Sequence, residues 1–249
     1  MPGYRKLFVL VGIAAFFAFS SLPTWAGVII GGTRVVFPAK AREVTVRLQN
    51  KATDPALVQA WVDNGDERSS PDTADAPFTL SPPIFRMEPG KGHSLRLIHT
   101  GEPLPTDKET LFWLNVLEVP PKPKDAAGQN ILQFAFRIRI KLFYRPENLA
   151  YASVEAPQKL TWTLIREGQE VQLEVTNPTP YHVTFSDVAL VSGSQRFAKR
   201  EAGGGMVSPG EKTRFPIVGV DASAKELTVE FKTINDYGAM VSANAHLTH

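Results

Sequence analysis

The sequence predicts an all-β protein built from two β-sandwich domains. Three observations support this: short stretches of alternating apolar and polar residues recur, turn-forming residues separate them, and no long stretch has the period of an amphipathic helix. Alternation with a period of two is typical of half-buried antiparallel strands. The length of 249 residues, with 43% apolar and 21% charged residues, is that of a globular protein of one or two domains.

Residues 1–26 have the layout of a secretory signal peptide. Arg5 and Lys6 form a positive start, an almost wholly apolar stretch runs from Leu7 to Phe19, and the small residue Ala26 ends the segment. We therefore expect cleavage after Ala26. A membrane anchor is the alternative, because the apolar stretch is near the lower length limit for a span.

The composition of the exported chain excludes several classes of function. The sequence has 27 Lys and Arg residues against 25 Asp and Glu residues, and two of the basic residues belong to the leader. The remainder is neutral, which gives no electrostatic reason to bind nucleic acid or an anionic membrane. The chain has no cysteine, which excludes disulfides, thiolate nucleophiles and cysteine-ligated metals. Export without cysteine favours a bacterial periplasm.

Four alternating stretches mark the expected strands in chain order: residues 43–48, the residues around Leu95 and Leu97, residues 170–175 and residues 227–231. In the first, Val44, Val46 and Leu48 would share one buried face. Turn signals separate the stretches: Pro89-Gly90, Asn177-Pro178, Pro209-Gly210 and Asn235 to Gly238. Many short strands with regular turns indicate β-sandwiches.

The chain divides into two similar halves. The string E-V-x-V-x-L-x-N at residues 43–50 recurs as E-V-x-L-x-V-x-N at residues 170–177. Turn chemistry alone is the other explanation of this faint repeat. We expect an N-terminal domain over 27–148 and a C-terminal domain over 149–249, since the strand pattern stops just after Pro146.

The stretch from Ile131 to Tyr144 is long for a single strand and has two different faces. Its even-numbered residues are all apolar or aromatic: Leu132, Phe134, Phe136, Ile138, Ile140, Leu142 and Tyr144. Its odd-numbered residues include Gln133, Arg137, Arg139 and Lys141. One interpretation is an ordinary strand with a cationic outer face. The other is a strand longer than its sandwich requires, which offers its surplus apolar residues to a partner by strand addition.

Six strings occur in the order in which a known family has them: Thr33 to Phe37, Ser81 to Gly90, Asp107 to Val116, Ile140 to Pro146, Asn177 to Tyr181, and Ile234 to Gly238. From about residue 31 to residue 238, the sequence resembles the PapD-like periplasmic pilus-assembly chaperones of the chaperone–usher pathway. The short segment 119–129 resembles the short-loop branch of that family.

The resemblance implies two immunoglobulin-like sandwiches set in an L, with a cleft between them, and a function that needs no catalysis, cofactor, metal or ATP. Such chaperones bind pilus or fimbrial subunits, which are immunoglobulin-like domains that lack a strand, and deliver them to an outer-membrane usher. They fill the gap by donor-strand complementation during fimbrium biogenesis, and a free chaperone can form a self-capping oligomer. The matching donor segment here is 130–144. Its expected contacts with the subunit groove are Leu132, Phe134, Phe136 and Ile138.

The resemblance also implies two clusters of charged residues. The other interpretation is that these are unrelated side chains exposed to solvent. Arg34 and Lys141 match an arginine and a lysine that hold the C-terminal carboxylate of the subunit. Glu109, Arg145 and Asp236 match a network that joins the two domains. Lys141 is odd-numbered whereas the donor residues are even-numbered, so on a regular strand their side chains point to opposite faces. A bulge or strong twist would be needed to bring them to one side.

Two other functions are compatible with the sequence. One is a structural surface or pilus subunit, although such subunits commonly use a disulfide. The other is a secreted immunoglobulin-like binding module or enzyme. His93 and His99 could share a strand face, but two histidines without a third ligand rarely form a metal site. The residues after Gly238 match no typical family ending, so the last strand is undefined by the sequence.

Overall fold

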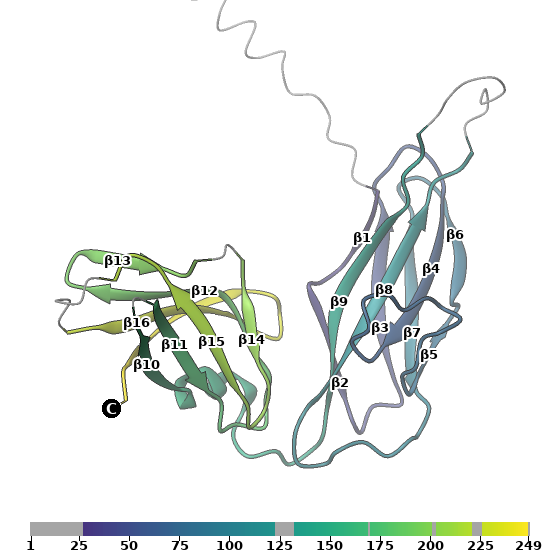
Figure 1. The fold of residues 1–249 in the computed structure, drawn as a ribbon. Helices are drawn as coiled ribbons and strands as arrows, with labels where there is room; N and C mark the ends of the chain where they lie inside the picture. The colour runs from purple at the N-terminus through teal and green to yellow at the C-terminus, as the bar shows by residue number, and fades with distance from the viewer. Residues whose placement is uncertain (1–26, 123–131, 169, 201–202, 221–225, 249) are drawn as a thin grey trace, which may run out of the picture.

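The computed structural model in Figure 1 describes residues 27–122, 132–168, 170–200, 203–220 and 226–248. The expected signal peptide and the first two residues of the donor segment, Asn130 and Ile131, lie outside these ranges. Two β domains meet at one end and diverge from there, so that the chain has the shape of an L (Figure 1). In the described residues, no helix is both long enough and apolar enough to cross a membrane.

The N-terminal domain is a sandwich of two sheets. One sheet has the order β1 (Val28–Ile30), β3 (Glu43–Asn50), β7 (Gly92–His99) and β5 (Phe78–Ser81). The other has the order β2 (Arg34–Pro38), β9 (Phe136–Arg145), β8 (Thr110–Val119), β4 (Ala56–Asp63) and β6 (Ile84–Met87). All pairings are antiparallel except that of β2 with β9, which is parallel.

The C-terminal domain repeats this architecture. A short 3₁₀ helix, η1 (Ser153–Lys159), precedes a sheet of β10 (Thr161–Glu167), β11 (Glu170–Thr176) and β15 (Lys212–Ile217). The facing sheet has the order β13 (Gln195–Ala198), β12 (Val183–Ser192), β16 (Thr228–Ile234) and β17 (Met240–His246), with β14 (Gly205–Val207) also paired to β12. The prediction of two β-sandwiches is therefore confirmed, and β17 is the last strand that the sequence left undefined.

The alternating stretches form strands because their apolar faces fill the two cores. Leu95 and Leu97 of β7 are fully buried in the N-terminal core, and Leu173 of β11 and Val229 of β16 are fully buried in the C-terminal core. Removing such side chains from water is the main favourable term in folding. The four predicted strands are confirmed by β3, β7, β11 and β16.

The predicted long strand is wrong at its beginning. β9 starts at Phe136, and residues 132–135 are not in a strand. The reason is pairing: Phe136 lies opposite Glu118, and β8 ends one residue later at Val119, so the earlier residues have no strand beside them. Gln133 donates to the carbonyl oxygens of Pro120 and Pro121 through its side chain only. The register between β8 and β9 is unbroken from Phe136 to Tyr144, so no bulge separates Lys141 from Phe136.

One edge of β9 is open over half of its length. β2 pairs with β9 only from Lys141 to Arg145, beginning at the pair Arg34–Lys141. The chain before Arg34 belongs to the opposite sheet, where β1 pairs with β3. Phe136 to Ile140 therefore bond β8 on one side, and no described strand pairs with their other side.

Candidate functional site

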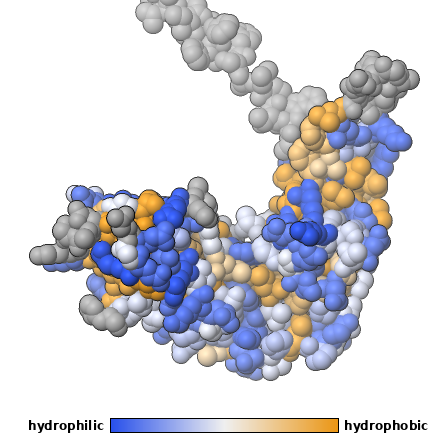
Figure 2. Space-filling model, viewed as in Figure 1, coloured by the Kyte–Doolittle hydropathy of each residue, from blue (hydrophilic) through white to orange (hydrophobic). Residues whose placement is uncertain are grey.

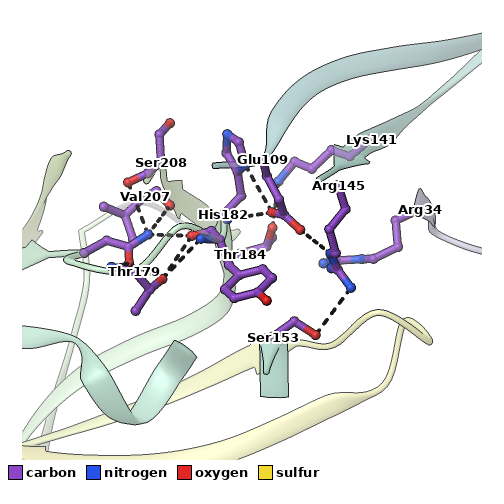
Figure 3. Close-up of polar contacts among 12 residues, drawn as sticks. Arg34, Glu109, Lys141, Arg145, Ser153, Thr179, His182, Thr184, Val207 and Ser208 are labelled. Carbon is purple, nitrogen blue, oxygen red and sulfur yellow. Dashed lines mark hydrogen bonds and ion pairs between the residues drawn. The ribbon is translucent and has the colours of Figure 1, made fainter. Parts of the chain in front are cut away.

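Arg34 and Lys141 lie side by side because their strands are parallel neighbours in register. The Arg34 guanidinium donates from Nη1 to the carbonyl oxygen of Ile234 in the C-terminal domain (2.8 Å). Lys141 Nζ donates to Thr184 Oγ1, also in the C-terminal domain (3.2 Å). The two cations thus reach across the junction between the domains from the same face of one sheet (Figure 3).

Neither cation forms an ion pair with any residue that the structure describes. Arg34 Nε is buried without a hydrogen-bond partner. Desolvation, followed by repulsion from Arg34, lowers the pKa of Lys141 from 10.5 to about 8. Desolvation also lowers the pKa of Arg34, although the charges of Asp236 and Glu109 oppose this. Two desolvated cations without a counterion form a site for an anion.

The cations line the cleft between the two domains. Trp113 and Lys141 of the N-terminal domain face Thr184, Met206 and Ile234 of the C-terminal domain around one open hollow. Arg34 lines a neighbouring pocket of about 390 Å³, which is walled mainly by the C-terminal domain. Lys141 is therefore accessible from the open side of the cleft.

The apolar face of β9 changes character along its length. Ile140 and Leu142 are buried in the N-terminal core, and Ile138 packs partly against it. Phe136 on the same face is 63% exposed, and Leu132 and Phe134, which precede the strand, are 77% and 58% exposed. Figure 2 shows apolar surface extending up the N-terminal domain toward the grey residues at its tip. Of the four expected groove contacts, three are therefore available in the free protein and Ile138 is half-buried.

Lys141 and Phe136 lie on opposite faces of β9, and the two faces have different surroundings. The odd face looks toward the C-terminal domain, where Lys141 meets Thr184. The even face continues the core of the N-terminal domain past its last paired residues. Lys141 and Phe136 therefore stay on different faces, as their numbering predicts for a strand without a bulge.

Glu109, Arg145 and Asp236 come together at the domain junction. Arg145, the last residue of β9, donates to Glu109 Oε1 from Nε (2.7 Å) and to both oxygens of Asp236 (2.7 and 2.8 Å). Burial favours neutral Arg145, but its hydrogen bonds to Asp236 and the charge of Glu109 outweigh burial and raise the pKa of Arg145. Burial likewise opposes ionisation of Asp236, but Arg145 lowers its pKa. Such a paired and desolvated network sets geometry more than it adds stability.

Further residues complete this junction, and no motif in the sequence pointed to them individually. Glu109, which is 4% exposed, also accepts from the backbone N–H of His182 (2.8 Å). Ser153 Oγ donates to Asp236 Oδ2 (2.8 Å), and the Arg145 guanidinium lies 5.3 Å from the centre of the Tyr181 ring. Ser153 and His182 are drawn in Figure 3 beside the two domains that they connect.

A second buried charge cluster, which the sequence analysis did not predict, lies on the face of β9 that carries the odd-numbered residues. Asp63 is 1% exposed and accepts from Arg139 Nη2 (2.6 Å), from Asn115 Nδ2 (2.6 Å) and from Ser69 Oγ (3.0 Å). The Arg139 guanidinium also lies 4.3 Å from the centre of the Trp113 ring. Burial opposes ionisation of Asp63, but Arg139 and Asn115 lower its pKa. The cluster fixes the cationic face of β9 to its own domain.

The two histidines considered as metal ligands are parts of aromatic clusters. His93 stacks on Phe85 with a centroid distance of 3.9 Å, and His99 lies 4.9 Å from Tyr144. Among the described residues, no group of three or more potential ligand side chains could hold a metal ion.

The fold and this site define a two-domain immunoglobulin-like protein with a basic cleft between its domains. Comparisons with known proteins agree. Residues 27–150 match the family profile "Pili and flagellar-assembly chaperone, PapD N-terminal domain", and residues 155–245 match "Pili assembly chaperone PapD, C-terminal domain". The chain is 41% identical over 233 residues to the probable fimbrial chaperone YadV of Escherichia coli strain K12, covering 92% of this chain and 93% of YadV.

Solved structures give the same result. The crystal structure of YadV superposes with a TM-score of 0.76 at 38% identity, covering 89% of this chain and 100% of that one. The CupB2 chaperone of Pseudomonas aeruginosa superposes with a TM-score of 0.73 at 40% identity, over 88% of this chain and 100% of that one. The chain therefore belongs to the family of PapD-type pilus-assembly chaperones, as its motifs predicted. This family is not enzymatic, and its members act in fimbrial assembly.

Proposed function

We propose that this protein binds fimbrial subunits in the periplasm by donating the segment 130–144, and that it holds the C-terminal carboxylate of the subunit between Arg34 and Lys141. It then delivers the subunit to an outer-membrane usher. A structural relative supports a subunit as the partner: the SafB chaperone of Salmonella enterica, in complex with the SafA pilin, superposes with a TM-score of 0.72 at 27% identity, over 91% of this chain and 99% of that one.

The observation that carries the proposal is the alignment of the open edge of β9 with the two cations. A subunit strand that pairs with Phe136 to Ile140 occupies the position that β2 takes further along the sheet. If it runs parallel to β9, its last residue comes to the start of β2, where Arg34 and Lys141 form no ion pair with a described residue. Strand addition supplies backbone hydrogen bonds, and the carboxylate fixes the register.

The exposed apolar residues supply the second part of the interaction. Leu132, Phe134 and Phe136 would lie in the groove that the missing strand leaves in the subunit. Each fully buried side chain contributes about 1.5–3 kcal/mol before the cost of ordering the segment. Self-association would bury these exposed apolar side chains, so we also propose that the free protein forms a self-capped oligomer in the absence of subunit. Sedimentation would detect the increase in mass.

Co-purification from periplasm that also contains a candidate subunit tests this function. We expect a one-to-one complex with the wild-type protein and none with Lys141→Ala. Lys91→Ala, which removes an exposed lysine from a turn, is the matched control and should bind as the wild type does. Equal recovery of subunit with Lys141→Ala would contradict the carboxylate site. A complex that survives Phe134→Asp would contradict donation of the apolar face.

A further inference from the structure

Glu118 is a carboxylate at the end of the N-terminal sandwich where the donor segment leaves the sheet, and no described cation pairs with it. It lies two residues after the buried Val116 on the core-facing side of β8, and it is paired in register with Phe136. In the described residues it forms no ion pair, and it accepts one hydrogen bond, from the backbone N–H of Val28 (2.8 Å). A half-buried carboxylate is costly in such surroundings unless a cation or several donors satisfy it.

The first described residue of the chain lies directly against this carboxylate. The position that a Cβ atom of Gly27 would take is 2.5 Å from Glu118 Oε1, so the carboxylate occupies the space that a side chain at residue 27 would fill. The Gly27 nitrogen is bonded to the same Cα atom, and is therefore at most about 5 Å from Oε1. The carbonyl oxygen of Gly27 accepts from the backbone N–H of Lys51 (3.0 Å), which holds the residue at the end of β1.

The nature of the group at the Gly27 nitrogen depends on processing. In the precursor it is a neutral amide. Hydrolysis of the Ala26–Gly27 bond by a signal peptidase consumes one water, leaves a carboxylate on Ala26, and leaves an amine on Gly27 that is protonated at neutral pH. We propose that this new α-ammonium group forms an ion pair with Glu118, and that the pair pins β1 to β8 beside the root of the donor segment. The inference rests on cleavage after Ala26 but not on how a subunit binds.

The pin connects the two sheets of the sandwich at its open end. β1 belongs to the sheet of β3, whereas Glu118 belongs to the sheet of β8 and β9. The precursor has the hydrogen bond from Val28 but not the charge, so the pin is complete only in the exported and processed protein. It also neutralises a carboxylate next to Phe136, where an apolar subunit surface would otherwise have to desolvate it.

A double-mutant cycle on the purified full-length mature protein tests the pin. One partner is varied by starting the chain at Gly27 or one residue earlier, at Ala26, which moves the ammonium group by about one residue length. The other is varied by Glu118→Gln, which keeps an acceptor for the Val28 N–H. With Glu118 present, we expect the chain that starts at Gly27 to melt about 2–4 °C higher, the shift that one partly buried ion pair gives in a protein of this size. In Glu118→Gln the two chain starts should melt together. Equal differences in both backgrounds, or none in either, would overturn the pin.

Two further measurements separate the possible failures. Mass spectrometry of the protein exported to the periplasm must give a chain that starts at Gly27, and any other start overturns the proposal. Titration of the Gly27 Cα resonances by NMR should give an amine pKa above the ordinary value of about 8 in the wild type, and an ordinary value in Glu118→Gln. An ordinary value in both would refute the ion pair even if the melting temperatures differed. Subunit co-purification is scored separately, so loss of the pin leaves the proposed function standing, and loss of subunit binding leaves the pin standing.

Discussion

Replacing Lys141 by methionine should make the free protein more stable, although it removes a residue that the proposed function requires. The pKa of Lys141 is lowered from 10.5 to about 8, first by desolvation and then by Arg34. At neutral pH this corresponds to a cost of about 3 kcal/mol for keeping the charged side chain in the folded protein. Solvent reaches part of the cleft and screens the charge, so we expect Lys141→Met to increase the free energy of unfolding by about 1–2 kcal/mol.

The sign of this effect depends on pH in a defined way. Between about pH 8 and pH 10.5 the unfolded chain keeps a proton on Lys141 that the folded protein has released. Wild-type stability should therefore rise with pH across this interval, while that of Lys141→Met should lack this contribution. The advantage of the variant is complete below about pH 7 and is lost by about pH 10.5.

Urea denaturation of the wild type, Lys141→Met and the control Lys91→Met, at about pH 7 and about pH 10, measures this difference. Lys91 lies exposed in a turn, so its replacement should change stability little at either pH. A loss of stability in Lys141→Met at both pH values, or a gain that is the same at both, would refute the reasoning that the cleft is built around an uncompensated charge.

Three other predictions concern the donor face and the two buried networks. Phe134→Asp should abolish subunit co-purification without lowering stability, because the side chain is exposed, whereas Ile140→Ala on the same face should cost about 2–4 kcal/mol in urea denaturation. Asp236→Asn should cost about 1–2 kcal/mol at neutral pH, since it removes a charged partner of Arg145. Because the pKa of Asp236 is lowered, this stabilisation exists above about pH 4 and is lost on further acidification, so calorimetric scans of wild type and variant should converge there. Asp63→Ala should cost about 3–5 kcal/mol by urea denaturation, and unchanged stability would contradict the account of its cluster.

Most of the fold follows from the alternation of apolar residues, but alternation does not predict pairing. Residues 43–48 and 170–175 alternate and form strands, because each pairs along its whole length with a neighbouring strand, β7 and β10 respectively. Leu132 and Phe134 alternate equally well and lie outside any strand, because β8 has ended. A periodic pattern reports which face of a strand is apolar. The partner that completes the sheet, whether from the same chain or from another, is not encoded in that pattern.

The site could be predicted only in part. Arg34 and Lys141 are far apart in sequence and meet because two strands are parallel neighbours, which no local spacing indicates. Only the resemblance to a family predicted that these two residues act together, and it predicted the same for Glu109, Arg145 and Asp236. No family motif pointed to Asp63. It lies in the string Trp61 to Gly65, whose Asp-Asn-Gly sequence is typical of a turn, and its burial depends on Arg139 from a distant strand.

The position of the two cations at the start of β2 also has a consequence for which chains this protein would accept. Under the proposed function, the C-terminus of the subunit's final strand is held at Lys141. The groove of the same subunit contacts apolar residues of the donor segment as far away as Leu132. At about 3.3 Å per residue, an extended segment between these points measures about 30 Å. The chaperone would then be sensitive to the number of residues between the groove of a bound chain and its C-terminus. A chain that stops one residue early would present the wrong face to Phe134 and Phe136, so the loss of a single C-terminal residue would weaken binding of an otherwise unchanged chain.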